Sequence, residues 1–160
     1  MTPSYAYAPR GERAYGNVPK NRGENTSLLA ALSLDEGVCA AMTLTGAVDG
    51  VAFEAYVKEV LCPKLRAGQV VILDRLNVHK SQRVREAILA KGCELVFLPS
   101  YSPDLNPIEL AFSKLKTWVR HVEARTREDL DDAIAAALKT VTLQDVIGWF
   151  GYAGYNHHLF

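Results

Sequence analysis

Two acidic residues, Asp74 and Glu109, occupy positions where a carboxylate can hold a ligand. Asp74 ends the apolar run QVVILD at 69–74, and Glu109 lies in the first turn of a predicted helix, after the proline-rich loop LPSYSPDLNP at 98–107. The 34 residues 75–108 lie between them. In layered α/β proteins, ligands collect beyond the carboxyl ends of parallel strands. The turn RLNVHKS after Asp74 would bring His79 and Lys80 near the same ligand.

A structural interpretation accounts for the same acidic residues. Asn106 suits a helix N-cap, Pro107 suits the first helical position, and Glu109 then completes a capping box. A single aspartate at a strand end, such as Asp74, is also typical of a turn or cap. Both interpretations stay open on these positions alone.

The composition predicts one globular domain over residues 1–160. The chain has 49% hydrophobic residues and a mean hydropathy near zero, and it is long enough for a core. No apolar run reaches the roughly 18 residues of a membrane span, and the N-terminus lacks the apolar middle of a signal peptide, so we expect a cytosolic protein. Cys39, Cys62 and Cys93 include no C-x-x-C pair. We expect buried hydrophobes there, not a disulfide framework or a zinc site.

The charge balance argues against a chain that holds nucleic acid by bulk charge. Lys plus Arg equals Asp plus Glu, at 18 each. Five basic residues lie from Arg75 to Lys91 against Glu86 alone, and the acidic stretch EDLDD at 128–132 offsets them elsewhere. This local excess permits contact with DNA, but it is also typical of a solvated helix face.

The patterning predicts an α/β arrangement with helices on a mixed sheet. The segments 26–34 and 37–45 are expected to form a β-hairpin, and 69–74 and 93–99 are expected to be strands buried on both faces. Helices are predicted by apolar spacing and by capping boxes at Thr126 with Asp129 and Thr142 with Asp145. The predicted helices cover 51–66, 81–92, 107–121, 127–140 and 143–152.

The flanks of Asp74 and Glu109 resemble the DDE transposases of the mariner-like superfamily, specifically the bacterial insertion sequence 630 group. In that family the second and third carboxylates are separated by the same interval of 34 residues. The second motif, commonly D-N-x-x-x-H-K, is matched at Asp74, His79 and Lys80, whereas Arg75 departs from it. The N-terminal APRGERAYG also resembles the family. The third motif, Y-S-P-D-L-N-P-I-E followed by an aromatic residue and L-K, is matched at Tyr101, Ser102, Pro103, Asp104, Leu105, Asn106, Pro107, Ile108, Glu109, Phe112, Leu115 and Lys116.

The resemblance implies an RNase H-like fold and divalent-metal-dependent DNA cleavage and strand transfer. Two Mg²⁺ or Mn²⁺ ions about 4 Å apart stabilise the attacking and leaving oxygens of such a reaction. These hard ions prefer oxygen ligands, which carboxylates supply. By this resemblance Asp74 would bridge the ions and Glu109 would bind one of them.

The resemblance also implies partners. DNA, as transposon ends and target, is the expected partner, together with a homo-oligomer or a full-length transposase, in the bacterial cytoplasm and at the nucleoid. Lys116 and Arg120 follow Glu109 and Ser113 along one face of the predicted helix, where they could contact DNA phosphates. The alternative is that this face is an ordinary solvated one. The residues predicted to contact DNA are His79, Lys80, Asn106, Lys116 and Arg120.

The family's first aspartate is expected on a central strand that precedes the segment matching MTPSYAYAPRGERAYG. Asp35 falls in the hairpin turn, and Asp49 is placed to cap the next helix, so neither is expected to replace it. We therefore expect an RNase H-like sheet without its first central strand, and two of three metal ligands. Two functions follow: a transposase catalytic domain that needs this strand from elsewhere, or a non-catalytic remnant that binds DNA or a full-length transposase. An α/β hydrolase is disfavoured by the lack of a G-x-S-x-G motif.

Overall fold

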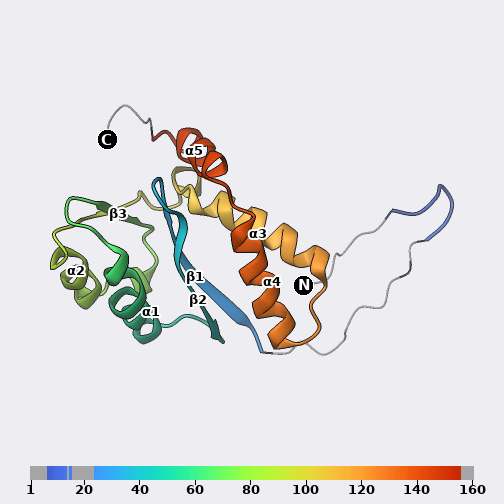
Figure 1. The fold of residues 1–160 in the computed structure, drawn as a ribbon, viewed down its shortest axis with the longest axis horizontal. Coiled ribbons are helices and arrows are strands. Elements are labelled where there is room, and N and C mark those ends of the chain that lie inside the picture. Colours follow the sequence, from blue (N-terminus) through green and yellow to red (C-terminus); the bar gives the residue numbers. More distant parts are fainter. Residues whose placement is uncertain (1–6, 14, 16–23, 156–160) are drawn as a thin grey trace.

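A computed structural model describes residues 7–13, 15 and 24–155 (Figure 1). Part of the N-terminal segment that resembles the family lies outside these residues. The strands are β1 (Thr26–Ser33), β2 (Gly37–Thr45), β3 (Val70–Leu73) and β4 (Glu94–Phe97). The α-helices are α1 (Gly50–Tyr56), α2 (Gln82–Leu89), α3 (Ile108–Val122), α4 (Arg127–Lys139) and α5 (Leu143–Tyr152). Within the described residues, no helix has the length and apolarity needed to cross a membrane.

The strands form two separate sheets of two strands each within the described part of the chain. β1 and β2 form the predicted antiparallel hairpin, and β3 pairs in parallel with β4, from Val70 opposite Glu94 to Leu73 opposite Phe97. Among these residues β1 pairs only with β2, and β3 only with β4. Each sheet therefore keeps open backbone edges to which a further strand can add.

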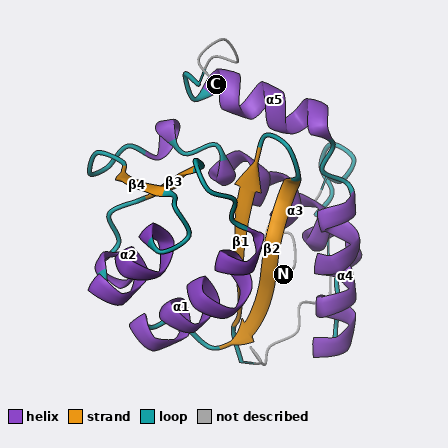
Figure 2. Ribbon diagram, turned by 60° about the vertical axis from the view of Figure 1, so that its left-hand side comes forward, coloured by secondary structure: helices purple, strands orange, loops and turns teal. Residues whose placement is uncertain are grey.

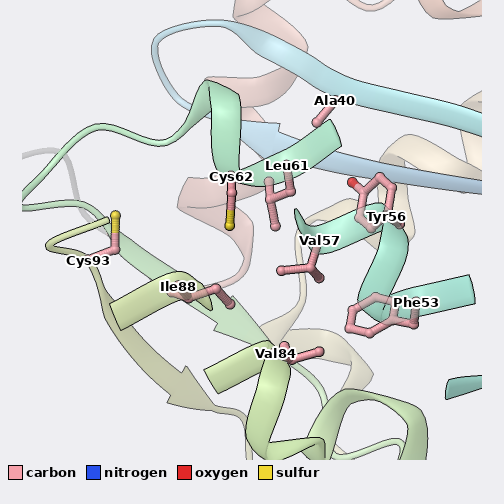
Figure 3. Close-up of a cluster of buried hydrophobic side chains, with 9 residues drawn as sticks. All are labelled: Ala40, Phe53, Tyr56, Val57, Leu61, Cys62, Val84, Ile88 and Cys93. Atoms are coloured by element: carbon pink, nitrogen blue, oxygen red, sulfur yellow. The ribbon is translucent and has the colours of Figure 1, made fainter. Parts of the chain in front are cut away.

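The first core lies between α1, α2 and one face of the hairpin (Figure 3). Val57, Val84 and Ile88 are fully buried there. Leu29 and Ala31 of β1 pack against this cluster, because residues two apart on a strand point to the same face. The cluster fixes the hairpin against the two helices that flank β3 in the sequence.

The helix predicted at 51–66 buries the predicted face, but it is not one continuous α-helix. Phe53, Val57 and Leu61 are buried, as their spacing predicts. However, α1 ends at Tyr56, a π-helical turn follows to Leu61, and a 3-10 turn covers Cys62–Lys64. Pro63 lies in this last turn, where it lacks the N–H that a continuing α-helix would need.

The second core covers the opposite face of the hairpin. Leu115 and Val119 of α3 are buried against Ala133 and Ala137 of α4, and Leu28 of β1 packs on them. Figures 1 and 2 show the result, with α1 and α2 on one side of the hairpin and α3 and α4 on the other. The hairpin is therefore the layer that joins the two halves of the molecule.

The prediction that β3 and β4 are buried on both faces is wrong. Val71, Leu73 and Leu95 pack on the first core, but Val70 is 41% exposed and Val96 is 45% exposed. The reason is that, within the described residues, α1 and α2 cover this small sheet from one side. An apolar run cannot distinguish a strand covered on both faces from one covered on one face.

The two predicted capping boxes, at Thr126 with Asp129 and at Thr142 with Asp145, are confirmed. The carboxylate of Asp145 also accepts a hydrogen bond from Nζ of Lys114 on α3, at 2.6 Å. The hydrogen bond from Lys114, together with those from Thr142, lowers the pKa of Asp145 to about 2. This ion pair fastens the start of α5 to the middle of α3.

Asp145→Asn should remove a pH-dependent part of the stability. Because the folded pKa of about 2 lies below the ordinary value of 3.8, the stabilisation by ionised Asp145 is complete above that ordinary value and is lost as the pH falls towards 2. Urea unfolding of wild type and variant across this range should show the difference in unfolding free energy shrinking in acid. Asp129→Asn, at the capping box without a lysine, should show a smaller change. A difference that does not vary with pH would contradict the assignment.

Candidate active site

Asp74 directly follows β3, at the carboxyl edge of the parallel pair. The N–H of Leu98 donates to the carbonyl of Leu73 at 2.8 Å, so β3 and β4 end side by side. Asp74 therefore leaves the same edge as the loop 99–107 that leads to Glu109. Oδ1 of Asp74 accepts a hydrogen bond from the N–H of Leu76 at 3.0 Å, which turns the chain away from the strand.

His79 lies against the carboxylate of Asp74. Its Nδ1 is 2.6 Å from Oδ1 of Asp74, and its ring centroid is 4.2 Å from that of Phe53 on α1. Nδ1 makes no hydrogen bond within the described residues, so the contact is a close polar one. The side chain of His79 is only 15% exposed, whereas that of Asp74 is 36% exposed. Within the described residues, the hydrogen bond and the close polar contact of Asp74 both use Oδ1, so Oδ2 is available to a ligand.

Helix α1 holds the C-terminal end of the turn that follows Asp74. Phe53 contacts the ring of His79, and the neighbouring Glu54 accepts a hydrogen bond from the hydroxyl of Ser81, the N-cap of α2. Nη1 of Arg83 lies 3.4 Å from the same carboxylate. Lys80 points to the surface and reaches Oδ1 of Asn77 at 3.4 Å. The turn is therefore braced on the side of His79 and exposed on the side of Lys80.

Glu109 lies in the first turn of α3 and is exposed. The capping box at Asn106 and Glu109, which is the structural alternative for Glu109, does not form. Pro107 is the N-cap, no side chain caps the helix, and the N–H of Glu109 donates to the backbone carbonyl of Asn106 at 3.1 Å. The helix begins one residue later than the box requires, so the structural explanation for Glu109 is removed. Its carboxylate makes no hydrogen bond within the described residues.

A small cavity of about 140 Å³ adjoins Glu109. Its lining includes Glu109 and also Asn106, which is predicted to contact DNA, but it does not include Asp74. The full lining is Pro103, Asp104, Asn106, Glu109, Leu110 and Tyr152. Among the residues that the structure describes, no three Asp, Glu, His or Cys side chains gather into a group able to hold a metal ion.

The remaining predicted residues continue the exposed face of Glu109. Ser113, Lys116 and Arg120 follow it at helical spacing and are exposed. The buried residues Ala111, Leu115 and Val119 lie on the other side of α3. In the described part of the chain, neither Lys116 nor Arg120 forms a salt bridge. Within the described residues this face carries two cations without salt bridges, about two and three turns along α3 from Glu109.

Two aspartates, Asp35 and Asp49, could be considered as replacements for the family's first aspartate. Both lie where the sequence predicts. Asp35 is in the hairpin turn, 3.4 Å from Nη2 of Arg66, and Asp49 caps α1 by accepting from the N–H of Ala52 at 2.8 Å. Neither is on a strand. Both carboxylates have local structural roles.

Sequence reasoning missed Phe53 and Glu54 as supports of the turn after Asp74. The helical spacing of Phe53 predicts only a core position, and nothing in the sequence pairs Glu54 with Ser81. It also missed Tyr152, which lines the cavity beside Glu109. These contacts join segments far apart in the chain, and the spacing of residues in one segment gives no signal for them.

The chain matches the family model described as DDE superfamily endonuclease over residues 1–131. Its fold is similar to that in "Crystal structure of the Mos1 Strand Transfer Complex" (TM-score 0.70, 18% identity) and "Mos1 transposase paired-end complex with left transposon end" (TM-score 0.73, 17% identity). Both matches cover 94% of this chain but only 45% and 46% of the other chains, so it spans less than half of their length. This likeness confirms the predicted RNase H-like fold. No curated protein matches the sequence.

His79→Ala should lower the free energy of unfolding by about 1–3 kcal/mol, because the ring loses its contact with Phe53 and its burial. Lys80→Ala is the matched control, since Lys80 is the exposed neighbour in the same turn. Its effect should stay within about 0.5 kcal/mol. Urea unfolding followed by circular dichroism measures both. Equal effects of the two substitutions would contradict the packed position of His79.

Proposed function

The chain belongs to the DDE superfamily of endonucleases, and from this premise we propose that it is a transposase catalytic domain that cleaves DNA and transfers a strand. The observation that supports this most strongly is the placement of two carboxylates. Asp74 ends β3, and Glu109 opens α3 after the loop that leaves β4. Helix capping does not explain Glu109, and the turn hydrogen bond of Asp74 uses only Oδ1 within the described residues. The proposed substrates are transposon ends and target DNA.

Asp74 and Glu109 would hold divalent cations, Mg²⁺ or Mn²⁺. Their chemistry fits, because both supply the oxygen donors that these hard ions prefer. Each also has an oxygen with no hydrogen bond among the described residues. Such ions, when bound, stabilise charge on the attacking and leaving oxygens of a phosphodiester. Oδ1 of Asp74 already accepts the hydrogen bond from the N–H of Leu76 and lies against His79, so Oδ2 is the oxygen proposed to bind the cation.

The exposed face of α3 would bind the DNA backbone. Lys116 and Arg120 lie on the same face as Glu109, so phosphates held by them would bring the strand to the carboxylate. Asn106 in the cavity and Lys80 on the exposed side of the turn would add polar contacts. His79 is mostly covered, so its proposed part in DNA contact depends on the edge of its ring that stays exposed.

We propose that a third carboxylate completes the site from a strand paired between the hairpin and β3. Open edges on both sheets and the lack of a group of three ligands within the described residues favour this arrangement. A longer form of the chain or a partner molecule would supply the strand. The same observations favour a second candidate function, a non-catalytic domain that binds DNA or a full-length transposase.

The remaining partners follow from the proposed function. The titles of the two Mos1 structures describe a strand transfer complex and a paired-end complex with a transposon end. By analogy this chain would act as an oligomer on DNA ends. Its proposed location is the cytoplasm of a bacterial cell, at the nucleoid when it is bound to DNA.

Asp74→Asn and Glu109→Gln should each abolish Mn²⁺-dependent nicking of supercoiled DNA, because each removes a negatively charged ligand while keeping the shape of the side chain. The assay should compare the chain as given with a form extended upstream by the proposed strand. Asp132→Asn, an exposed carboxylate on α4, is the matched control and should retain nicking.

Nicking by the extended form alone would support a site completed by that strand. Nicking by the short form would mean that another residue completes the site. If neither form nicks DNA, the non-catalytic function is favoured. Activity that persists in Asp74→Asn or Glu109→Gln would exclude that residue from the mechanism.

Lys116→Ala should weaken DNA binding to a similar degree for all sequences and reduce the slope of log K against log salt by about one. The reason is that one phosphate contact, with its released counterion, is lost. Fluorescence anisotropy over a salt series measures the slope. Lys139→Ala, at the exposed end of α4, is the control and should leave the slope unchanged. An unchanged slope in Lys116→Ala as well would contradict the phosphate contact and would assign Lys116 to an ordinary solvated face.

A further inference from the structure

The C-terminal helix α5 contacts the Glu109 loop although it lies beyond the residues matched by the family model. That match ends at residue 131, whereas α5 covers Leu143–Tyr152. Tyr152 of α5 lines the cavity that contains Glu109. In Figure 1, α5 lies above the start of α3. The match to the family model therefore stops short of a segment that adjoins the candidate site.

Tyr155, just after α5, makes the direct contact. Its hydroxyl donates a hydrogen bond to the backbone carbonyl of Leu105 at 3.0 Å, across 50 residues of sequence. Leu105 ends the 3-10 turn Pro103–Leu105 inside the SPDLNP loop. Within the described residues this is the one hydrogen bond that the carbonyl of Leu105 receives.

The phenol of Tyr155 is itself held in place. The ring of Tyr155 packs edge-on against Phe150, with the ring centroids 5.7 Å apart. The backbone N–H of Tyr155 donates a hydrogen bond to the carbonyl of Phe150 at 2.9 Å. Helix α5 is fastened to α3 by the Lys114–Asp145 pair, and Nζ of Lys114 also donates to the carbonyl of Thr140 at 3.0 Å. The hydroxyl is thus presented from a fixed support. Burial raises the pKa of Tyr155 further above neutrality, so the phenol is protonated and donates.

The peptide that Tyr155 holds is the one that precedes the start of α3. Leu105 is followed by Asn106, whose carbonyl accepts the N–H of Glu109. Within the described residues no side chain caps α3, so backbone hydrogen bonds alone hold the N-terminus of its first turn. A rotation of the Leu105–Asn106 peptide would shift Asn106 and, through it, the backbone of Glu109.

We propose that Tyr155 is a positioning residue for Glu109, acting through its hydrogen bond to the carbonyl of Leu105 from the α5 support. This inference rests on the proposed function insofar as Glu109 is a metal ligand. It extends the functional unit of the chain beyond the family model, to the end of the described residues. Loss of one such hydrogen bond should weaken Mn²⁺ binding at Glu109 by about two- to tenfold.

The test is Tyr155→Phe, which deletes only the hydroxyl and keeps the ring against Phe150. Tyr56→Phe is the matched control, because the hydroxyl of Tyr56 is buried without a partner in the described part of the chain and belongs to the first core. Hydrogen–deuterium exchange of the 160-residue chain should show faster exchange of the Glu109 and Leu110 amides in Tyr155→Phe only. The Mn²⁺ concentration for half-maximal nicking, measured in the form that cleaves DNA, should rise by about two- to tenfold in Tyr155→Phe and stay unchanged in Tyr56→Phe.

Each outcome decides one of the two proposals. Unchanged exchange in Tyr155→Phe would overturn the positioning role, whether or not the protein cleaves DNA. Faster exchange with an unchanged Mn²⁺ requirement would reduce Tyr155 to a purely structural contact and also overturn it. If no form of the wild type cleaves DNA, the proposed function fails, and the exchange experiment alone then decides whether Tyr155 fixes the start of α3.

Discussion

The candidate site depends on the parallel pairing of β3 with β4. The hydrogen bond from Leu98 to Leu73 makes the two strands end together, so Asp74 and the loop towards Glu109 emerge from one edge. Two four-residue strands are not stable by themselves. They persist because Val71, Leu73 and Leu95 pack into the first core with α1 and α2.

The two carboxylates are supported by different halves of the molecule. Asp74 belongs to the half built around α1, where Phe53 and Glu54 hold the turn that follows it. Glu109 belongs to the half built from α3, α4 and α5. The hairpin packs against both halves, with Leu29 on one side and Leu28 on the other. The relative position of the two carboxylates therefore depends on how well the hairpin holds these halves together, and a strand added between the hairpin and β3 would strengthen that connection.

Local sequence rules predicted most of the fold. The hairpin, the parallel strands and the capping boxes at Thr126 and Thr142 follow from patterns within single segments, and the structure confirms them. The capping box at Asn106 does not form because α3 begins one residue later than that box requires. Burial of β3 and β4 was overestimated because apolar composition does not report how many faces are covered. The contacts of His79 with Phe53 and of Tyr155 with Leu105 join distant segments, which no spacing within a motif can predict.

The central claim is that Asp74 and Glu109 share one divalent-cation site, and iron-mediated cleavage of the backbone tests it most directly. Fe²⁺ that occupies such a site in the presence of ascorbate and peroxide cuts the chain near its ligands, and mass spectrometry locates the cuts. Our account predicts two groups of cuts, one near Asp74 and one near Glu109, both suppressed by excess Mg²⁺. Cuts near only one of these residues, or cuts that Mg²⁺ does not suppress, would contradict a shared site.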